Sequence, residues 1–107
     1  MQTQHTIQEL LNKNDAVILY FSAPTCGVCH ALKPKLTEAL INEFPTFIIE
    51  SIDISEKPEI GSHFSVFTIP TVLIYLQGGE FLRKSRNMSV AEVIEGIRRP
   101  YTLMVES

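Results

Sequence analysis

Three stretches of the chain carry the pattern of β strands that lie inside a sheet. Residues 16–22 read A-V-I-L-Y-F-S and residues 71–76 read T-V-L-I-Y-L, and both runs are rich in strand-forming apolar residues. Such runs are typical of strands buried on both faces. Residues 47–54 alternate instead, and one of their two faces holds Ile48, Ile52 and Ile54. The turn residues 77–80, Q-G-G-E, predict a hairpin that returns as an edge strand over 81–86.

Helical spacing marks the segments between and around these strands. Residues 6–12 begin with the capping-box pair Thr6 and Glu9 and have apolar residues on one side only. Residues 55–63 form a short helix with Pro58 in its first turn. The last helix begins with a second capping-box pair, Ser89 and Glu92, and is expected to stop at residues 98–100. Residues 101–107 have no clear period and are expected to form a tail.

The longest helix, expected over residues 26–43, follows directly on the strand 16–22. Its apolar residues recur at every fourth position, from Val28 through Leu36 to Leu40. Pro34 lies inside this run, where its missing N–H predicts a kink rather than an end, because the stripe resumes beyond it. A helix that joins the first two strands makes that pair parallel. We therefore expect an α/β fold, a three-layer α/β/α sandwich around a four-stranded mixed sheet.

Composition narrows the class of protein. The 107 residues suit a single domain, 1–107, and hydrophobic and charged contents of 45% and 20% are ordinary for a soluble globular protein. The formal net charge of −3 gives no reason to expect nucleic acid or an anionic membrane as a partner. The first residues, M-Q-T-Q-H-T, show no signal peptide, and no apolar run reaches the length of a membrane span. We therefore expect a cytoplasmic protein.

Both cysteines of the chain lie two residues apart, where the first strand gives way to the longest helix. A helix N-terminus presents unpaired N–H groups and the positive end of the helix dipole, which favour an anion. Cys26 should therefore ionise more readily than a free cysteine, and the thiolate is the reactive form. Two cysteines at this spacing, in a chain without an export signal, favour redox or metal chemistry over a disulfide scaffold.

The C-x-x-C motif at a strand-to-helix turn, Pro34 five residues after Cys29, and the segment Thr68-Ile69-Pro70-Thr71 resemble the thioredoxin family over residues 16–97. The resemblance implies a thioredoxin fold with strand order second, first, third, fourth. It implies a thiol–disulfide oxidoreductase that reduces protein or small-molecule disulfides, with Cys26 as the attacking thiol and Cys29 as the resolving thiol. A cis peptide bond before Pro70 is also implied.

Further expectations follow from the same resemblance. The substrate would bind along two segments, which contain Thr25, Gly27, Val28, Thr68, Ile69 and Pro70. Electrons would come from an upstream thiol reductase such as a thioredoxin reductase. The chain would act as a monomer, without a cofactor or metal. An alternative function is an interaction module that binds a partner at the groove between Cys26 and Pro70 without turnover.

Two other chemistries fit the cysteines less well. The residues Cys26 to His30 also match the C-x-x-C-H pattern of c-type haem attachment, but the strand before them and the Ile69-Pro70 segment have no role in that pattern. A zinc site needs four ligands, and the chain offers only two cysteines and three histidines, without a second pair at finger spacing.

The sequence also departs from the family pattern near the dithiol. The residue between the cysteines that is proline in common thioredoxins is Val28 here, which leaves the redox potential open. The family's buried acid near the resolving cysteine falls at Tyr20, and the glycine that precedes its last helix falls near Arg86 or Asn87. Because tyrosine is a poor proton acceptor near neutral pH, Cys29 would have to rely on solvent, on His30, or on an acid such as Glu50 or Asp53.

Overall fold

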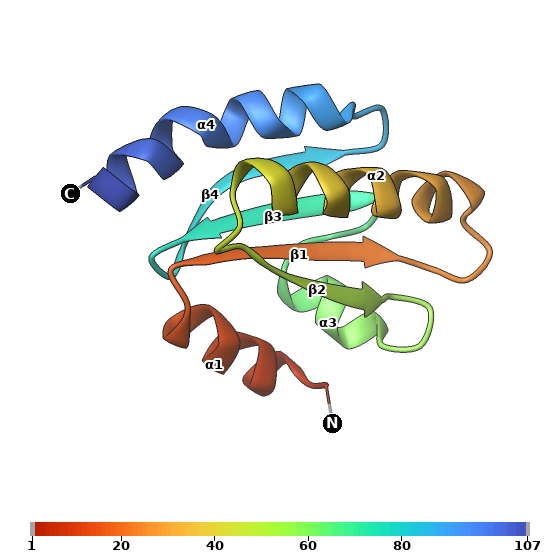
Figure 1. Ribbon diagram of the computed structural model, residues 1–107. Coiled ribbons are helices and arrows are strands. Elements are labelled where there is room, and N and C mark those ends of the chain that lie inside the picture. The colour runs from red at the N-terminus through yellow and green to blue at the C-terminus, as the bar shows by residue number, and fades with distance from the viewer. Residues whose placement is uncertain (1, 107) are drawn as a thin grey trace.

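The computed structural model describes residues 2–106 and arranges them as four helices and a four-stranded sheet (Figure 1). Along the chain, the elements are α1 (Gln4–Lys13), β1 (Ala16–Ser22), α2 (Gly27–Glu43), β2 (Ile48–Asp53), α3 (Pro58–His63), β3 (Thr71–Leu76), β4 (Gly79–Ser85) and α4 (Val90–Glu106). The predicted strands 16–22 and 71–76 are confirmed to the residue, and the others are confirmed with small shifts at their ends.

The sheet has the order β2-β1-β3-β4, as the family resemblance implied. β1 pairs in parallel with β2, so that Phe21 lies opposite Ile52, and pairs antiparallel with β3, so that Tyr20 lies opposite Val72. β3 and β4 form an antiparallel hairpin. Its turn residues Gln77 and Gly78 both have positive φ, 52° and 83°, the combination that the tightest hairpin turns require.

Helices cover both faces of the sheet, which confirms the three-layer sandwich (Figure 1). β1 supplies both cores because its side chains alternate. Ile18 and Tyr20 pack with residues of α2 and α4 into the first core, whereas Val17, Leu19 and Phe21 pack with residues of α1 and α3 into the second. Every residue from Ala16 to Phe21 is buried, so this strand has no side open to solvent.

The start of α1 differs from the prediction. The N-cap is Thr3 rather than Thr6, and Thr6 serves as the partner three residues later. The Thr6 N–H donates to Thr3 Oγ1 at 3.1 Å, and the Thr3 N–H donates to Thr6 Oγ1 at 2.8 Å. A threonine can fill either role in a capping box, so the shorter helix expected over 6–12 gains two residues at its start.

α2 runs without interruption past Pro34, as predicted, and Leu36 and Leu40 lie in the first core. Val28 does not share their side, because 64% of its surface is exposed. The residue that points inward from the first turn is Cys29, which is 1% exposed. The four-residue spacing of apolar positions therefore predicted the wrong side of the helix for Val28.

α4 does not stop at residues 98–100, and the predicted tail is wrong: residues 101–106 are helical, and residue 107 lies outside the described residues. Pro100 removes one N–H from the helix, which favoured a stop. Tyr101 supplies the compensating contacts. Its ring lies 4.7 Å from that of Phe44 and 5.7 Å from that of Phe47, and its hydroxyl is 2.7 Å from Thr46 Oγ1. None of the helices described is long and apolar enough to cross a membrane.

Tyr101→Ala is expected to lower the free energy of unfolding by about 3 kcal/mol, because a buried aromatic ring and its contacts are lost. Leu103→Ala is the matched control, since Leu103 lies two residues further on and is 56% exposed. This control should change the free energy of unfolding by about 0.5 kcal/mol or less. Urea titrations of both variants measure the difference, and equal small effects would mean that the last turns of α4 contribute nothing to stability.

Candidate active site

The dithiol lies where β1 ends and α2 begins, at the carboxyl edge of the parallel strands (Figure 1). Cys26 is the N-cap of α2, and its backbone N–H donates to the Ala23 carbonyl at 3.0 Å, which closes the turn after β1. The two cysteines form a disulfide, with their Cα atoms 5.3 Å apart. The Cys29 N–H donates to Cys26 Sγ at 3.1 Å. This N–H and the helix dipole would stabilise a thiolate at the same sulfur.

The two cysteines differ in their access to solvent. Cys26 is half-buried, and the neighbouring Thr25, Gly27 and Val28 are exposed around it. Cys29, one turn into the helix, is 1% exposed and belongs to the first core. An incoming disulfide can therefore reach the Cys26 sulfur first, while the Cys29 sulfur faces the protein interior. This is the arrangement that an attacking and a resolving thiol require.

The segment before β3 lies at the same edge of the sheet as the dithiol, because Thr71, where β3 begins, pairs with Phe21 near the end of β1. The Ile69–Pro70 peptide bond is cis, as predicted. Ile69 packs against the same core as Cys26 and Met88, and the Pro70 carbonyl accepts the Arg86 N–H at 2.8 Å. Pro70 itself is buried, whereas Thr68 and Ile69 are half-buried. The structure thus brings the two predicted substrate-binding segments and the connection between β4 and α4 to one edge of the sheet.

Arg83 on β4 is a positioning residue that the sequence analysis missed. Its guanidinium donates to the carbonyls of Phe64 and Ser65 at 2.9 Å each, and to both carboxylate oxygens of Glu80 at 2.9 Å. Ser65 has a positive φ of 56°, so these contacts hold an uncommon backbone conformation a few residues before Thr68. From the sequence, only an edge strand is expected here. The available signal was an acidic and a basic residue three positions apart on this strand, Glu80 and Arg83.

Tyr20 occupies the buried position beside Cys29. Its side chain is fully buried, and its hydroxyl donates to the Cys29 carbonyl at 2.7 Å. Burial raises the pKa of Tyr20 above its ordinary value. This hydroxyl is therefore neutral at physiological pH, and it joins β1 to the first turn of α2.

The other predicted residues near the dithiol lie at the surface. His30 is exposed, and its Nε2 lies 2.9 Å from the Pro24 carbonyl, so this nitrogen carries the proton. Arg86 is exposed too and has a positive φ of 59° at the position expected for the family's glycine. Within residues 2–106, the His, Cys, Asp and Glu side chains form no group of three or more that would hold a metal ion.

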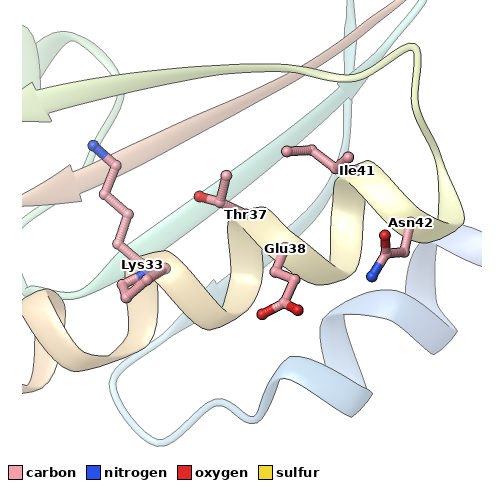
Figure 2. A pocket seen from close by; sticks show the side chains of 6 residues that line it. Lys33, Thr37, Glu38, Ile41 and Asn42 are labelled. Carbon is pink, nitrogen blue, oxygen red and sulfur yellow. The ribbon is translucent and has the colours of Figure 1, made fainter.

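A hollow of about 460 Å³ lies along α2 beyond the dithiol, lined by Lys33, Pro34, Thr37, Glu38, Ile41 and Asn42 (Figure 2). All six residues belong to α2, so the hollow follows the surface of this helix. Neither cysteine lines it, and neither does the segment before β3. It is therefore separate from the site around Cys26 and Pro70.

Comparison with known proteins gives the family of the chain. The family model described as Thioredoxin matches residues 1–99. The chain belongs to the thioredoxin family. The thioredoxin-like protein YdfQ of Bacillus subtilis is 32% identical over 98 residues, which cover 92% of this chain and 87% of that protein. Membership in the thioredoxin family, together with a cysteine pair at disulfide distance, identifies the chain as a thiol–disulfide oxidoreductase in general terms.

Solved structures of thioredoxins have the same fold. Thioredoxin 1 of Thermosipho africanus is 37% identical and has a TM-score of 0.73, with 85% of this chain and 99% of that chain covered. A mutant thioredoxin from Halobacterium salinarum is 24% identical and has a TM-score of 0.81, with 95% of this chain and 88% of that chain covered. The second similarity supports the thioredoxin fold alone.

After reduction with a phosphine, Cys26 is expected to be the only thiol that a short exposure to iodoacetamide alkylates near neutral pH. Cys26 is half-buried and accepts an N–H, whereas Cys29 is 1% exposed. Mass spectrometry should show a single adduct on Cys26. In a Cys26→Ser control, labelling of Cys29 should be slower on the order of tenfold. Preferential labelling of Cys29 in the unmodified chain would reverse the two roles.

The contact between Glu80 and Arg83 should make part of the stability depend on pH. The hydrogen bond from Arg83 is the main reason that the pKa of Glu80 lies below its ordinary value. A carboxylate of this kind contributes stability above its unfolded-state pKa and loses that contribution as the pH falls through its folded-state pKa. Glu80→Gln should therefore lower the free energy of unfolding by up to about 1 kcal/mol at neutral pH, and by progressively less on acidification. Urea titrations over the acid range check this, with Glu56→Gln, which removes an exposed carboxylate outside this contact, as the control.

Proposed function

We propose that this thioredoxin-family chain reduces protein disulfides, with Cys26 as the attacking thiol and Cys29 as the resolving thiol. The observation that carries the proposal is the unequal placement of the two sulfurs. Cys26 caps α2 at the surface and accepts the Cys29 N–H, whereas Cys29 is buried one turn further on. A surface thiolate next to a buried partner suits a reaction in two steps, with a covalent intermediate between them.

The two steps balance without a cofactor. The Cys26 thiolate attacks one sulfur of the substrate disulfide, and the other substrate sulfur leaves as a thiolate and takes a proton. Cys29 then loses its proton and attacks Cys26 Sγ, which releases the second substrate thiol and leaves the Cys26–Cys29 disulfide. The substrate has gained two electrons and two protons. An upstream thiol reductase, such as a thioredoxin reductase, would return the electrons in a reducing compartment such as the cytoplasm.

The proposed substrate surface consists of Thr25, Gly27 and Val28 on one side of Cys26 and of Thr68, Ile69 and Pro70 on the other. Val28 is 64% exposed, and Phe67, next to Thr68, is 76% exposed. Exposed apolar side chains around a reactive sulfur would favour extended polypeptide over a small polar disulfide. Protein disulfides are therefore the proposed substrate class, with a single copy of the chain acting on each.

The reductase proposal predicts that the chain accelerates the reduction of insulin by dithiothreitol, and that Cys26→Ser abolishes this acceleration. Cys29→Ser should retain the first step and accumulate a mixed disulfide with a cysteine-containing peptide, visible by mass spectrometry. Binding of a peptide by the unmodified chain without any acceleration of insulin reduction would favour the alternative, an interaction module without turnover.

A further inference from the structure

The resolving step raises a question that the proposed function leaves open, namely which group takes the proton of Cys29. Cys29 is 1% exposed, and burial disfavours its thiolate form. Its buried neighbour from β1 is Tyr20, whose hydroxyl already donates to the Cys29 carbonyl at 2.7 Å. Burial raises the pKa of Tyr20, so the phenolate that would accept a proton is not formed near neutral pH.

The other charged groups on the elements that surround the first core are either paired with another residue or exposed to solvent. Apart from tyrosine and cysteine, the only buried polar or charged residue within 2–106 is Thr71, and the other buried tyrosine of the first core, Tyr101, pairs its hydroxyl with Thr46. On α2, the charged residues Lys33, Lys35, Glu38 and Glu43 are all exposed. On α4 and β4, Glu92 pairs with Lys84 and Glu95 with Arg98, and Arg99 and Glu106 are exposed.

The two acids on β2 that the sequence analysis considered are not suited to the task. Glu50 shares its face with Ile48 and Ile52, which pack in the second core, on the opposite side of the sheet from Cys29. It also accepts a hydrogen bond from Gln2 at 2.9 Å. Asp53 accepts hydrogen bonds from the backbone and hydroxyl of Ser55 at 2.9 and 2.6 Å. The Ser55 hydroxyl is the main reason that the pKa of Asp53 is lowered, which makes it a weaker base.

We propose that Tyr20 is a positioning residue that holds the first turn of α2 through the Cys29 carbonyl, and that Cys29 gives its proton to solvent. The inference rests on the proposed function. A base from solvent removes the Cys29 proton, the Cys29 sulfur bonds to Cys26 Sγ, and the bond between Cys26 and the substrate sulfur breaks. The substrate thiolate leaves with the electron pair and is protonated by water. The covalent complex with substrate therefore persists until solvent can deprotonate a buried thiol.

This route has a specific dependence on pH. With no carboxylate to take the proton, the resolving rate follows the fraction of Cys29 present as thiolate, which grows about tenfold for each pH unit while the thiol predominates. A built-in carboxylate would be ionised throughout the neutral range and would flatten that dependence. The mixed disulfide of this chain should thus be longest-lived on the acid side of neutrality.

The test uses the reduced chain and 5,5′-dithiobis(2-nitrobenzoate), whose coloured thiolate is released once in the attacking step and once in the resolving step. Stopped-flow absorbance separates the two phases. The second phase is expected to accelerate about 100-fold between about pH 6 and pH 8, without a plateau. Tyr20→Asp should flatten this profile and raise the rate at the acid end by at least about tenfold.

Two further variants make the result decisive even if Tyr20→Asp does not fold. Tyr20→Phe removes the hydroxyl but no proton acceptor, so it should keep the steep profile of the unmodified chain. A profile that is shallow in the unmodified chain and becomes steep in Tyr20→Phe would identify the Tyr20 oxygen as the acceptor and overturn the proposal. His30→Asn should also keep the profile. An inflection in the unmodified chain that disappears in His30→Asn would assign the proton to His30 instead. A missing first phase would contradict the reductase proposal itself, independently of these profiles.

Discussion

The burial of β1 on both faces is the constraint on which the rest of the structure depends. Its two edges pair with β2 and β3, and its alternating side chains complete the two cores on either side of the sheet. The strand therefore ends at a fixed point. The turn that follows places Cys26 at the N-terminus of α2, and Tyr20, two residues before that end, meets the first turn of the same helix. The position of the dithiol follows from the packing of this single strand.

Much of this arrangement could be predicted because it depends on local patterns. The apolar runs 16–22 and 71–76 are bounded by turn residues, which leaves little freedom for their ends. The features that escaped prediction depend on contacts between distant segments. Pro100 is a local stop signal, but Tyr101 packs on Phe44 and Phe47 from the other end of α2, and those contacts outweigh the lost hydrogen bond. Thr3 and Thr6 offer equivalent caps, and local sequence does not distinguish them.

In the candidate site too, the features set by local sequence could be predicted and those set by contacts between distant segments could not. The spacing of the cysteines and their place between strand and helix indicated which sulfur would be accessible, and the structure confirms that placement. The roles of Arg83 and Tyr20 were not visible, because both donate to backbone carbonyls, and any residue supplies a carbonyl. Arg83 reaches Phe64 and Ser65 across 19 and 18 positions of sequence. For a hydrogen bond of this kind, the sequence identifies only the donor side chain and gives no information about which carbonyl accepts.

α2 and α4 both begin near the dithiol edge and end at the opposite side of the molecule, where Tyr101 of α4 meets Phe44 at the end of α2 (Figure 1). Each helix has 17 residues, which corresponds to a length of about 25 Å. The reactive sulfur of Cys26 therefore lies far from the end of α4, where a label or tether can be attached. A dye, a surface linker or an electrode tether fixed at the exposed Thr102 would be held roughly a helix length away from Cys26 and would leave the path to that sulfur open.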